Sequence, residues 1–227
     1  PLLYSSAASY VYRRQLFDTT DNGLTLAVAT AGVADATMAH IHTGFAGVNG
    51  GVLVALEQDT ADVNLWTSGG ELNLDQATAN LLLSGGHYVN VHTPANTSGE
   101  LRGQITPANI EVYGVVPSGE QEVPAVTTDA SGTGAITLNT STGLIIGTIN
   151  VFDISPTMAH IHVGEAGVNG GVVLALTDTG DGVFTVPADT LLDMTQMDLM
   201  QAAGLYTNFH TTTNPSGEIR GQITLGF

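Results

Sequence analysis

The feature that most constrains this chain is an internal repeat of domain size. Residues 38–56 read MAHIHTGFAGVNGGVLVAL and residues 158–176 read MAHIHVGEAGVNGGVVLAL, with 15 of the 19 positions identical. A second pair of segments, 88–106 and 206–224, repeats YxNxHT followed by SGE, R and GQIT. A period of about 20–50 residues would indicate a solenoid, whereas this much longer period indicates two copies of a complete domain. We place copy 1 at residues 1–108 and copy 2 at residues 109–227.

Each copy is expected to be an all-β domain, an antiparallel β-sandwich with one short helix. The apolar segments are short, rich in Val, Ile and Thr, and separated by Gly, Asn, Asp and Pro, as in 144–151 and 172–176. Many such segments at regular spacing are typical of sandwiches and barrels. Residues 74–84 and 188–203 are each followed by a glycine, and they predict the one helix in each copy.

The two copies differ at their N-terminal ends. At a spacing of 120 residues, the equivalent of Val123 is residue 3, so copy 1 has almost no room for the strand that opens copy 2. We expect this first strand to be missing from copy 1 or supplied from elsewhere. An unpaired strand edge can pair with another chain. Residues 1–12 are apolar and β-prone, so they are either a strand donated to another molecule or an arm packed on its own domain.

Charge and composition exclude several kinds of partner and cofactor. The chain has 21 acidic and four basic residues, a formal net charge of −17, which disfavours nucleic acids and anionic membranes and favours cations. It has no cysteine, which excludes disulfides and thiolate metal sites. No apolar run reaches the roughly 18 residues of a membrane-spanning helix. The first residue is proline and no leader precedes it, which indicates a cleaved signal peptide or a trimmed chain. This composition favours a secreted, extracellular or cell-surface protein.

Six of the seven histidines fall at repeated positions. Alternate residues of a strand point to the same face, so the two histidines of each His-x-His pair are expected to converge, joined by a third from the second motif. Neutral imidazole is a ligand for zinc and copper, and a methionine two residues before each pair would favour Cu(I). The alternative is that these histidines only brace the sandwich through hydrogen bonds. The candidate ligands are His40, His42 and His92 in copy 1 and His160, His162 and His210 in copy 2.

Two further motifs recur in each copy. Glu100 and Arg102, like Glu218 and Arg220, alternate along a strand, and we interpret them as a structural clasp that closes the domain end, in preference to a substrate site. The GVNGG segments at 47–51 and 167–171 are interpreted as turns whose glycines need positive φ, with no nucleotide-binding role because they lack a P-loop lysine.

Taken together, these motifs resemble the CHRD (chordin-type) domain family. The resemblance is carried by AHIH with GxxGxNG, by the YVNVHT-like strand, and by SGE[LI]RGQI, each present twice; EQEVP at 120–124 adds to it in copy 2. The resemblance implies an extracellular immunoglobulin-like or superoxide-dismutase-like β-sandwich, without a settled activity.

The leading functional hypothesis is a secreted, non-catalytic protein. We expect it to bind a transition metal, copper in preference to zinc, through the three histidines of each repeat. We also expect self-association, as a homo-oligomer or an extracellular polymer or filament formed by strand exchange. One alternative is a copper oxidoreductase resembling superoxide dismutase, and another is a cell-surface protein-binding module without metal.

Overall fold

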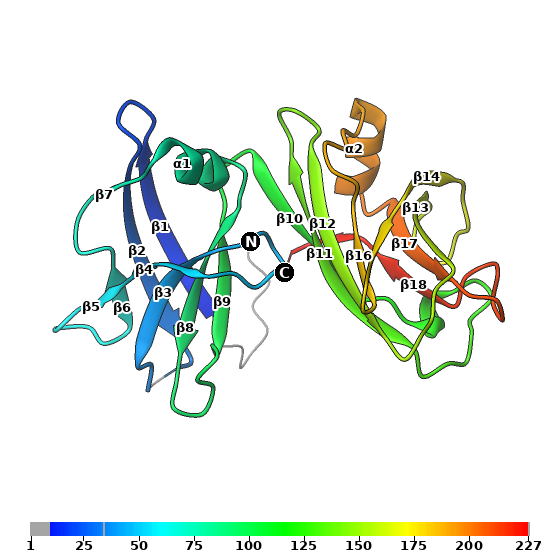
Figure 1. Cartoon of the computed structure of the whole chain (residues 1–227), viewed down its shortest axis with the longest axis horizontal. Coiled ribbons are helices and arrows are strands. Elements are labelled where there is room, and N and C mark those ends of the chain that lie inside the picture. The colour runs from blue at the N-terminus through cyan, green and yellow to red at the C-terminus, as the bar shows by residue number, and fades with distance from the viewer. Residues whose placement is uncertain (1–9, 34, 227) are drawn as a thin grey trace. The chain divides into compact units, whose positions relative to one another are not determined.

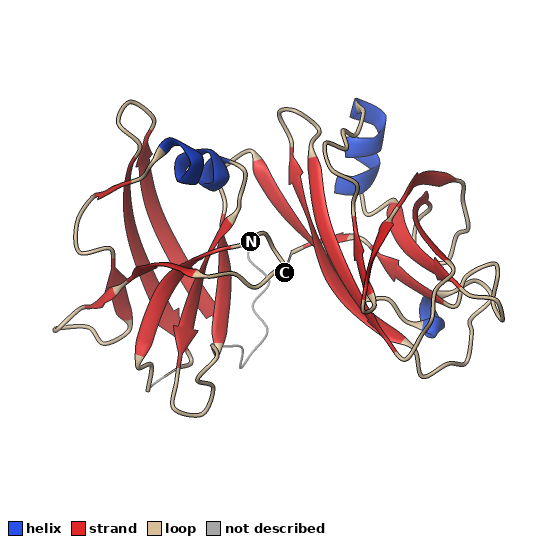
Figure 2. Ribbon diagram, viewed as in Figure 1, coloured by secondary structure: helices blue, strands red, loops and turns tan. Residues whose placement is uncertain are grey.

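The computed structural model describes residues 10–33 and 35–226, and it confirms the all-β fold class. The described residues divide into two compact units, one formed by residues 10–45 with 49–107, the other by 46–48 with 108–226. Strands are the main secondary structure of each unit, and each unit carries one short α-helix (Figures 1 and 2). Among the helices in the described ranges, none combines the length and the apolar character needed to cross a membrane.

Copy 1 is built from two antiparallel sheets. One has the strand order β1-β2-β6-β5, with β7 also pairing β2, and the other has the order β4-β3-β8-β9. The first sheet comprises β1 (Tyr10–Asp18), β2 (Gly23–Ala31), β5 (Glu57–Gln58), β6 (Leu65–Thr67) and β7 (Leu72–Asn73). The second comprises β3 (Met38–Thr43), β4 (Val52–Ala55), β8 (His87–His92) and β9 (Leu101–Ile105).

Copy 2 repeats this arrangement and extends it. Its sheets have the strand orders β15-β16-β12-β11-β10-β19 and β14-β13-β17-β18. The first sheet comprises β10 (Ile110–Val115), β11 (Ser131–Asn139), β12 (Ile145–Phe152), β15 (Thr177–Gly180), β16 (Val183–Thr185) and β19 (Thr224–Leu225). The second comprises β13 (Met158–Val163), β14 (Val172–Ala175), β17 (Leu205–His210) and β18 (Ile219–Gln222).

Alternation along the strands gives each copy a hydrophobic core between its two sheets. In β12 every second residue from Ile145 to Val151 is buried, the period expected of a strand with one face toward a core. The core of copy 1 joins Leu26 and Val28 of β2 to Ile41 of β3 and Val89 of β8. The core of copy 2 contains none of these residues. Each copy is therefore a sandwich with a core of its own.

The two helices are shorter than the sequence predicts. α1 spans Gln76–Leu83 and α2 spans Met194–Gln201. Each begins directly after an aspartate, Asp75 or Asp193, whose carboxylate accepts a backbone N–H three residues later. Such an N-cap satisfies a backbone donor that the first turn leaves without a partner, so the cap and not the preceding apolar residues sets the start of the helix.

The copies differ where the sequence predicts a missing strand. In copy 2, β11 pairs with β12 on one side and with β10 on the other. In copy 1 the equivalent strand, β1, pairs with β2, and no described residue pairs with its other edge. Tyr10–Tyr12 of the candidate N-terminal arm belong to β1 and pair with β2 of the same copy. Residues 1–9 of that arm lie outside the described residues.

Candidate metal centre

Two neighbouring strands bring three histidines together in each copy. His40 and His42 lie on β3, and His92 ends the antiparallel partner strand β8. One ring nitrogen from each of the three lies within 4.8 Å of the other two, and His40 Nδ1 lies at hydrogen-bond distance, 3.0 Å, from His92 Nε2. The same arrangement recurs in copy 2, where β13 and β17 supply His160, His162 and His210. These two clusters contain only histidine.

Backbone carbonyls fix which nitrogen of two of these rings carries the hydrogen. The Nδ1 of His42 lies 2.9 Å from the carbonyl oxygen of Gly50, and the Nδ1 of His92 lies 3.0 Å from that of Thr97. A carbonyl oxygen can only accept, so each Nδ1 donates and the neutral ring keeps its lone pair on Nε2. In copy 2 the carbonyls of Gly170 and Pro215 hold His162 and His210 in the same way.

One nitrogen in each cluster is buried and has no hydrogen-bond partner among the described residues. It is the Nε2 of His42 in copy 1 and of His162 in copy 2. A buried acceptor without a partner costs free energy, about 1–3 kcal/mol in proteins. A metal ion bound to this lone pair would remove that cost. The residues therefore fit a metal ion, which the three imidazoles of each copy could hold with neutral nitrogen ligands.

Burial keeps several of these imidazoles in the neutral form that a metal requires. Burial lowers the pKa of His40, and the neighbouring His92 and His42 lower it further through charge repulsion. The pKa of His160 and that of His210 are lowered in copy 2, again chiefly by burial. Because metal and proton compete for the same lone pair, a lowered pKa favours metal binding near neutral pH.

In each cluster a tyrosine ring stacks on one histidine, and an arginine lies over that tyrosine ring. The ring of His42 lies parallel to that of Tyr88, with centroids 5.0 Å apart, and the guanidinium carbon of Arg102 lies 3.4 Å from the centroid of the Tyr88 ring. In copy 2, Tyr206 and Arg220 form the same stack on His162, at 5.1 and 3.5 Å. Strand alternation places Tyr88 on the same face as His92, but sequence reasoning gave neither tyrosine a role, although each repeats four residues before the third histidine.

The GVNGG loop of copy 1 connects this stack to the histidine cluster. Arg102 donates to the carbonyl oxygen of Phe45 at 2.9 Å and to the side-chain oxygen of Asn49 at 3.3 Å. The next residue, Gly50, donates its N–H to the Tyr88 hydroxyl and accepts from His42 with its carbonyl. The loop therefore holds both His42 and the tyrosine that covers it.

Space, and not backbone conformation, requires glycine at the key position of this loop. Gly47 has a φ of 79°, as the sequence predicts, but Gly50 is not among the residues with positive φ. A Cβ built on Gly50 would lie 1.5 Å from the carbonyl oxygen of Thr43, which no side chain can tolerate. The prediction of positive φ was therefore wrong for Gly50, where a neighbouring strand leaves no room, and it was also wrong for Gly51.

The predicted clasp residues hold two different loops. Glu100 accepts hydrogen bonds from Thr93 and Asn96. These residues belong to the turn whose Thr97 carbonyl accepts the hydrogen bond from His92. Glu218 accepts from Thr211 in the equivalent turn of copy 2 and also from Thr128. The arginines hold the GVNGG loops instead. The glutamates therefore hold the turns that orient His92 and His210, and the arginines hold the loops that orient His42 and His162.

Copy 2 adds a buried carboxyl group beside its arginine. Glu122 is 7% exposed and its side chain lies near Asn208 and Arg220. Burial raises the pKa of Glu122 to about 7, against the opposing effect of the Arg220 charge and of the Asn208 hydrogen bond. Arg220 is itself 1% exposed, whereas Arg102 is half-buried. Sequence reasoning did not single out Glu122.

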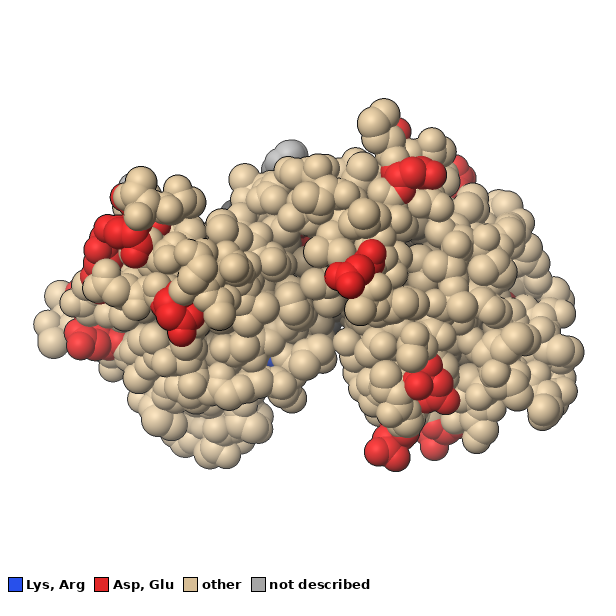
Figure 3. Space-filling model, turned by 45° about the horizontal axis from the view of Figure 1, so that its top comes forward, with Lys and Arg blue, Asp and Glu red and all other residues tan. Residues whose placement is uncertain are grey.

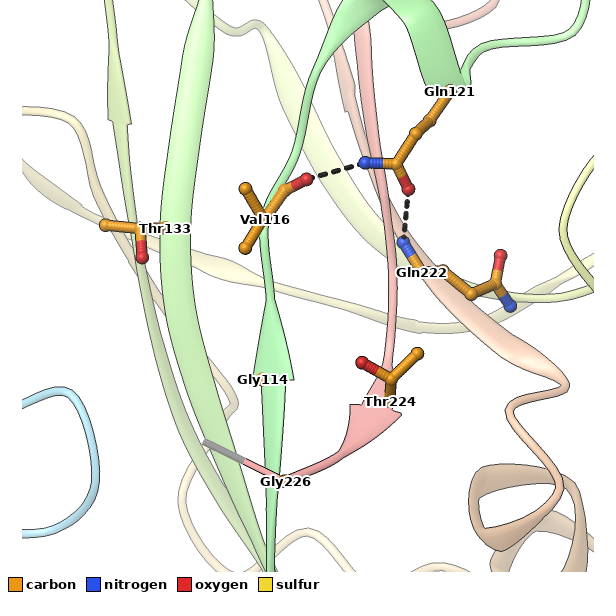
Figure 4. A pocket seen from close by; sticks show the side chains of 7 residues that line it. All are labelled: Gly114, Val116, Gln121, Thr133, Gln222, Thr224 and Gly226. Atoms are coloured by element: carbon orange, nitrogen blue, oxygen red, sulfur yellow. Dashed lines mark hydrogen bonds between the residues drawn. The ribbon is translucent and has the colours of Figure 1, made fainter. Parts of the chain in front are cut away.

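Gln121 fixes the segment that carries this carboxyl group (Figure 4). Its side chain donates to the Val116 carbonyl oxygen at 2.6 Å and accepts from the Gln222 N–H at 3.0 Å. These contacts border an open depression of about 510 Å³, and the described residues that line it include no histidine and no ionisable side chain. The lining residues are Gly114, Val116, Gln121, Thr133, Gln222, Thr224 and Gly226. This depression thus has no residues suited to metal binding or acid–base chemistry.

The surface carries acidic groups but few cations. On the face shown in Figure 3, acidic side chains form small separate groups and basic side chains are almost absent. Arg102 and Arg220, two of the four basic residues, are partly or fully buried in the stacks described above. Their charges therefore act chiefly on the interior of each copy.

Comparison with known proteins gives one family. The family model for the CHRD domain matches residues 13–105 and again residues 113–223, which together make up most of the chain. Neither the curated proteins nor the solved structures contain a significant match. Both matched segments include all three histidines of their copy.

Proposed function

Because this chain belongs to the CHRD-domain family and carries two tandem copies of that domain, we propose that it is a non-catalytic extracellular protein that binds one transition-metal ion in each copy. The observation that carries the proposal is the buried Nε2 of His42 and of His162. Neither has a hydrogen-bond partner in the described part of the chain, and each ring is held by a backbone carbonyl at its Nδ1. Metal-binding histidines are commonly oriented by such a bond from the other ring nitrogen.

Copper is the ion that we favour. Three imidazoles without a carboxylate or thiolate suit copper and zinc, and among divalent ions copper binds such sites most tightly. Met38 pairs directly opposite His92 across β3 and β8, and Met158 opposite His210 across β13 and β17, so a thioether lies on the strand position next to each cluster. Sulfur ligands favour Cu(I) over zinc.

The test is elemental analysis of the purified protein after loading with copper or zinc. We expect about two ions per chain, and about one in His40→Ala/His42→Ala or in His160→Ala/His162→Ala, because each pair supplies two of three ligands in its own copy. Unchanged stoichiometry in the two variants, or a wild type that holds no metal after loading, would leave the histidines with a bracing role only. If the copper-loaded protein turned over superoxide, the protein would be an oxidoreductase and the non-catalytic role would be rejected.

A second candidate function is self-assembly by strand exchange. The observation that favours it is the difference between the copies, because β11 has a partner strand, β10, on the edge where β1 has none among the described residues. An edge of this kind can accept a strand from another molecule. Assembly outside the cell would then present the metal sites in a regular array.

A further inference from the structure

In each copy, an arginine lies on the far side of a tyrosine ring that stacks on one histidine of the cluster, so a permanent positive charge lies near the proposed metal site. In copy 1 the order is His42, Tyr88 and Arg102, with 5.0 Å between the two ring centroids and 3.4 Å from the tyrosine centroid to the guanidinium carbon. Copy 2 repeats the order with nearly the same distances. A guanidinium stays charged at any pH at which proteins are folded. An ion bound at the cluster would therefore lie on the order of 10 Å from a fixed cation in a partly buried setting.

The ligands do nothing to offset this charge. Both clusters consist of three imidazoles, which bring no negative charge, and no carboxylate of the described residues joins them. An incoming ion keeps its full charge, and a doubly charged ion is repelled by the arginine about twice as strongly as a singly charged one.

We propose that Arg102 and Arg220 make the two centres selective for univalent copper, Cu(I), over Cu(II) and other divalent ions. This inference rests on the proposed metal binding and goes beyond it by assigning the charge of the ion and the residues that select it. The arginines act through the field of their charge and through the loop that they hold, so they are positioning residues and not ligands. Cu(I) also accepts three-coordinate geometry, which matches the three nitrogens available.

The expected size of the effect follows from Coulomb's law. A unit charge about 10 Å from the ion, at an effective dielectric constant of about 20, changes the relative affinity for singly and doubly charged ions by roughly tenfold. Loss of the loop contacts of Arg102 would instead weaken all ions alike, because it loosens His42 whatever ion is bound. The ratio of two affinities therefore separates the charge of the arginine from its structural role.

The experiment measures that ratio at one centre at a time. In the His160→Ala/His162→Ala background, only the centre of copy 1 remains, and Arg102→Gln removes the charge while Arg102→Lys keeps it and loses the planar fork of donors. Dissociation constants for Cu(I), under anaerobic conditions, and for Cu(II) are obtained by competition with chromophoric chelators specific for each ion. We expect Arg102→Gln to lower the preference for Cu(I) by about tenfold and Arg102→Lys to preserve most of it.

In copy 2, a substitution is available that should change the preference for Cu(I) in the opposite direction. Glu122 lies near Arg220, so its ionised carboxylate offsets part of the arginine charge. In the His40→Ala/His42→Ala background at pH 8, Glu122→Gln is expected to raise the preference for Cu(I) severalfold. Equal losses of Cu(I) and Cu(II) affinity in Arg102→Gln, or a wild type that prefers Cu(II), would overturn the inference while leaving metal binding intact. A wild type that binds neither ion would overturn both proposals.

Discussion

At the scale of single residues, the fit of these clusters to a metal depends on proton positions that sequence spacing does not specify. The His-x-His pairs and the third histidine were predictable from the repeat and from the two-residue period of a strand. That Nδ1 of His42 donates to a loop carbonyl, leaving Nε2 buried and without a partner among the described residues, follows from where Gly50 lies in three dimensions. That carbonyl belongs to a residue eight positions away, beyond the reach of strand periodicity.

Glu122 gives a residue-scale prediction about stability and pH. Its pKa is raised to about 7 in the folded protein, so between about pH 4.5 and 7 the unfolded chain releases a proton that the native chain keeps. The free energy of unfolding of copy 2 should therefore fall as pH rises through this window and level off above it. Glu122→Gln should remove this fall, which is on the order of 2 kcal/mol.

The measurement is denaturant unfolding of the metal-free protein at a series of pH values. The advantage of Glu122→Gln over the wild type should grow from pH 4.5 to pH 7.5. Glu120→Gln, at an exposed position two residues earlier, is the matched control and should follow the wild type. A Glu122→Gln protein with the same pH dependence as the wild type would show that this carboxyl group keeps an ordinary pKa.

At the scale of elements, the loop between β3 and β4 connects the three repeated motifs. Arg102 of β9 donates hydrogen bonds to Phe45 and Asn49 in this loop. The backbone of Gly50, in the same loop, forms hydrogen bonds with Tyr88 and His42. The sequence indicated the loop, its glycines and the arginine as separate features. Their connection was not predictable, because it depends on how β3, β8 and β9 lie beside one another in the sheet.

Two neighbouring glycines in this loop allow a matched test. A Cβ at Gly50 would lie 1.5 Å from the Thr43 carbonyl oxygen, whereas a Cβ at Gly51 has nothing within 4 Å. Gly50→Ala must displace the carbonyl that orients His42, so we expect the metal affinity of copy 1 to fall by about 10- to 100-fold. Gly51→Ala should leave it unchanged.

Affinities are measured by chelator competition in the His160→Ala/His162→Ala background, so that copy 2 does not contribute. Circular dichroism of each variant checks that copy 1 is still folded. Equal affinities in the two alanine variants would mean that the Gly50 carbonyl does not position His42.

At the scale of the whole molecule, the duplication, the sandwich fold and the unequal ends of the two copies were all predictable from the sequence. The repeat gave the number of copies, and strand periodicity gave the fold class. The helix starts were less accurate, because side-chain caps at Asp75 and Asp193 override the apolar pattern. The sequence left open whether residues 1–12 pack on their own domain or form a strand donated to another molecule. In the structure, Tyr10–Tyr12 pair within copy 1 as part of β1.

That pairing restricts the strand-exchange hypothesis to residues 1–9 as the donated segment, with the outer edge of β1 as the acceptor. The segment PLLYSSAAS is uncharged and largely apolar, which suits an added strand. If it joins copies of the chain, its deletion should leave monomers, whereas the wild type should form larger species as concentration rises. Sedimentation velocity over a range of concentrations measures both.

Leu2→Asp/Leu3→Asp, which keeps the length of the segment and removes its apolar character, should weaken assembly as the deletion does. Added peptide of residues 1–9 should compete with the intact segment and shorten the assemblies. Wild-type and deleted proteins with the same size distribution would exclude strand exchange through residues 1–9, and they would leave metal binding as the function that both copies share.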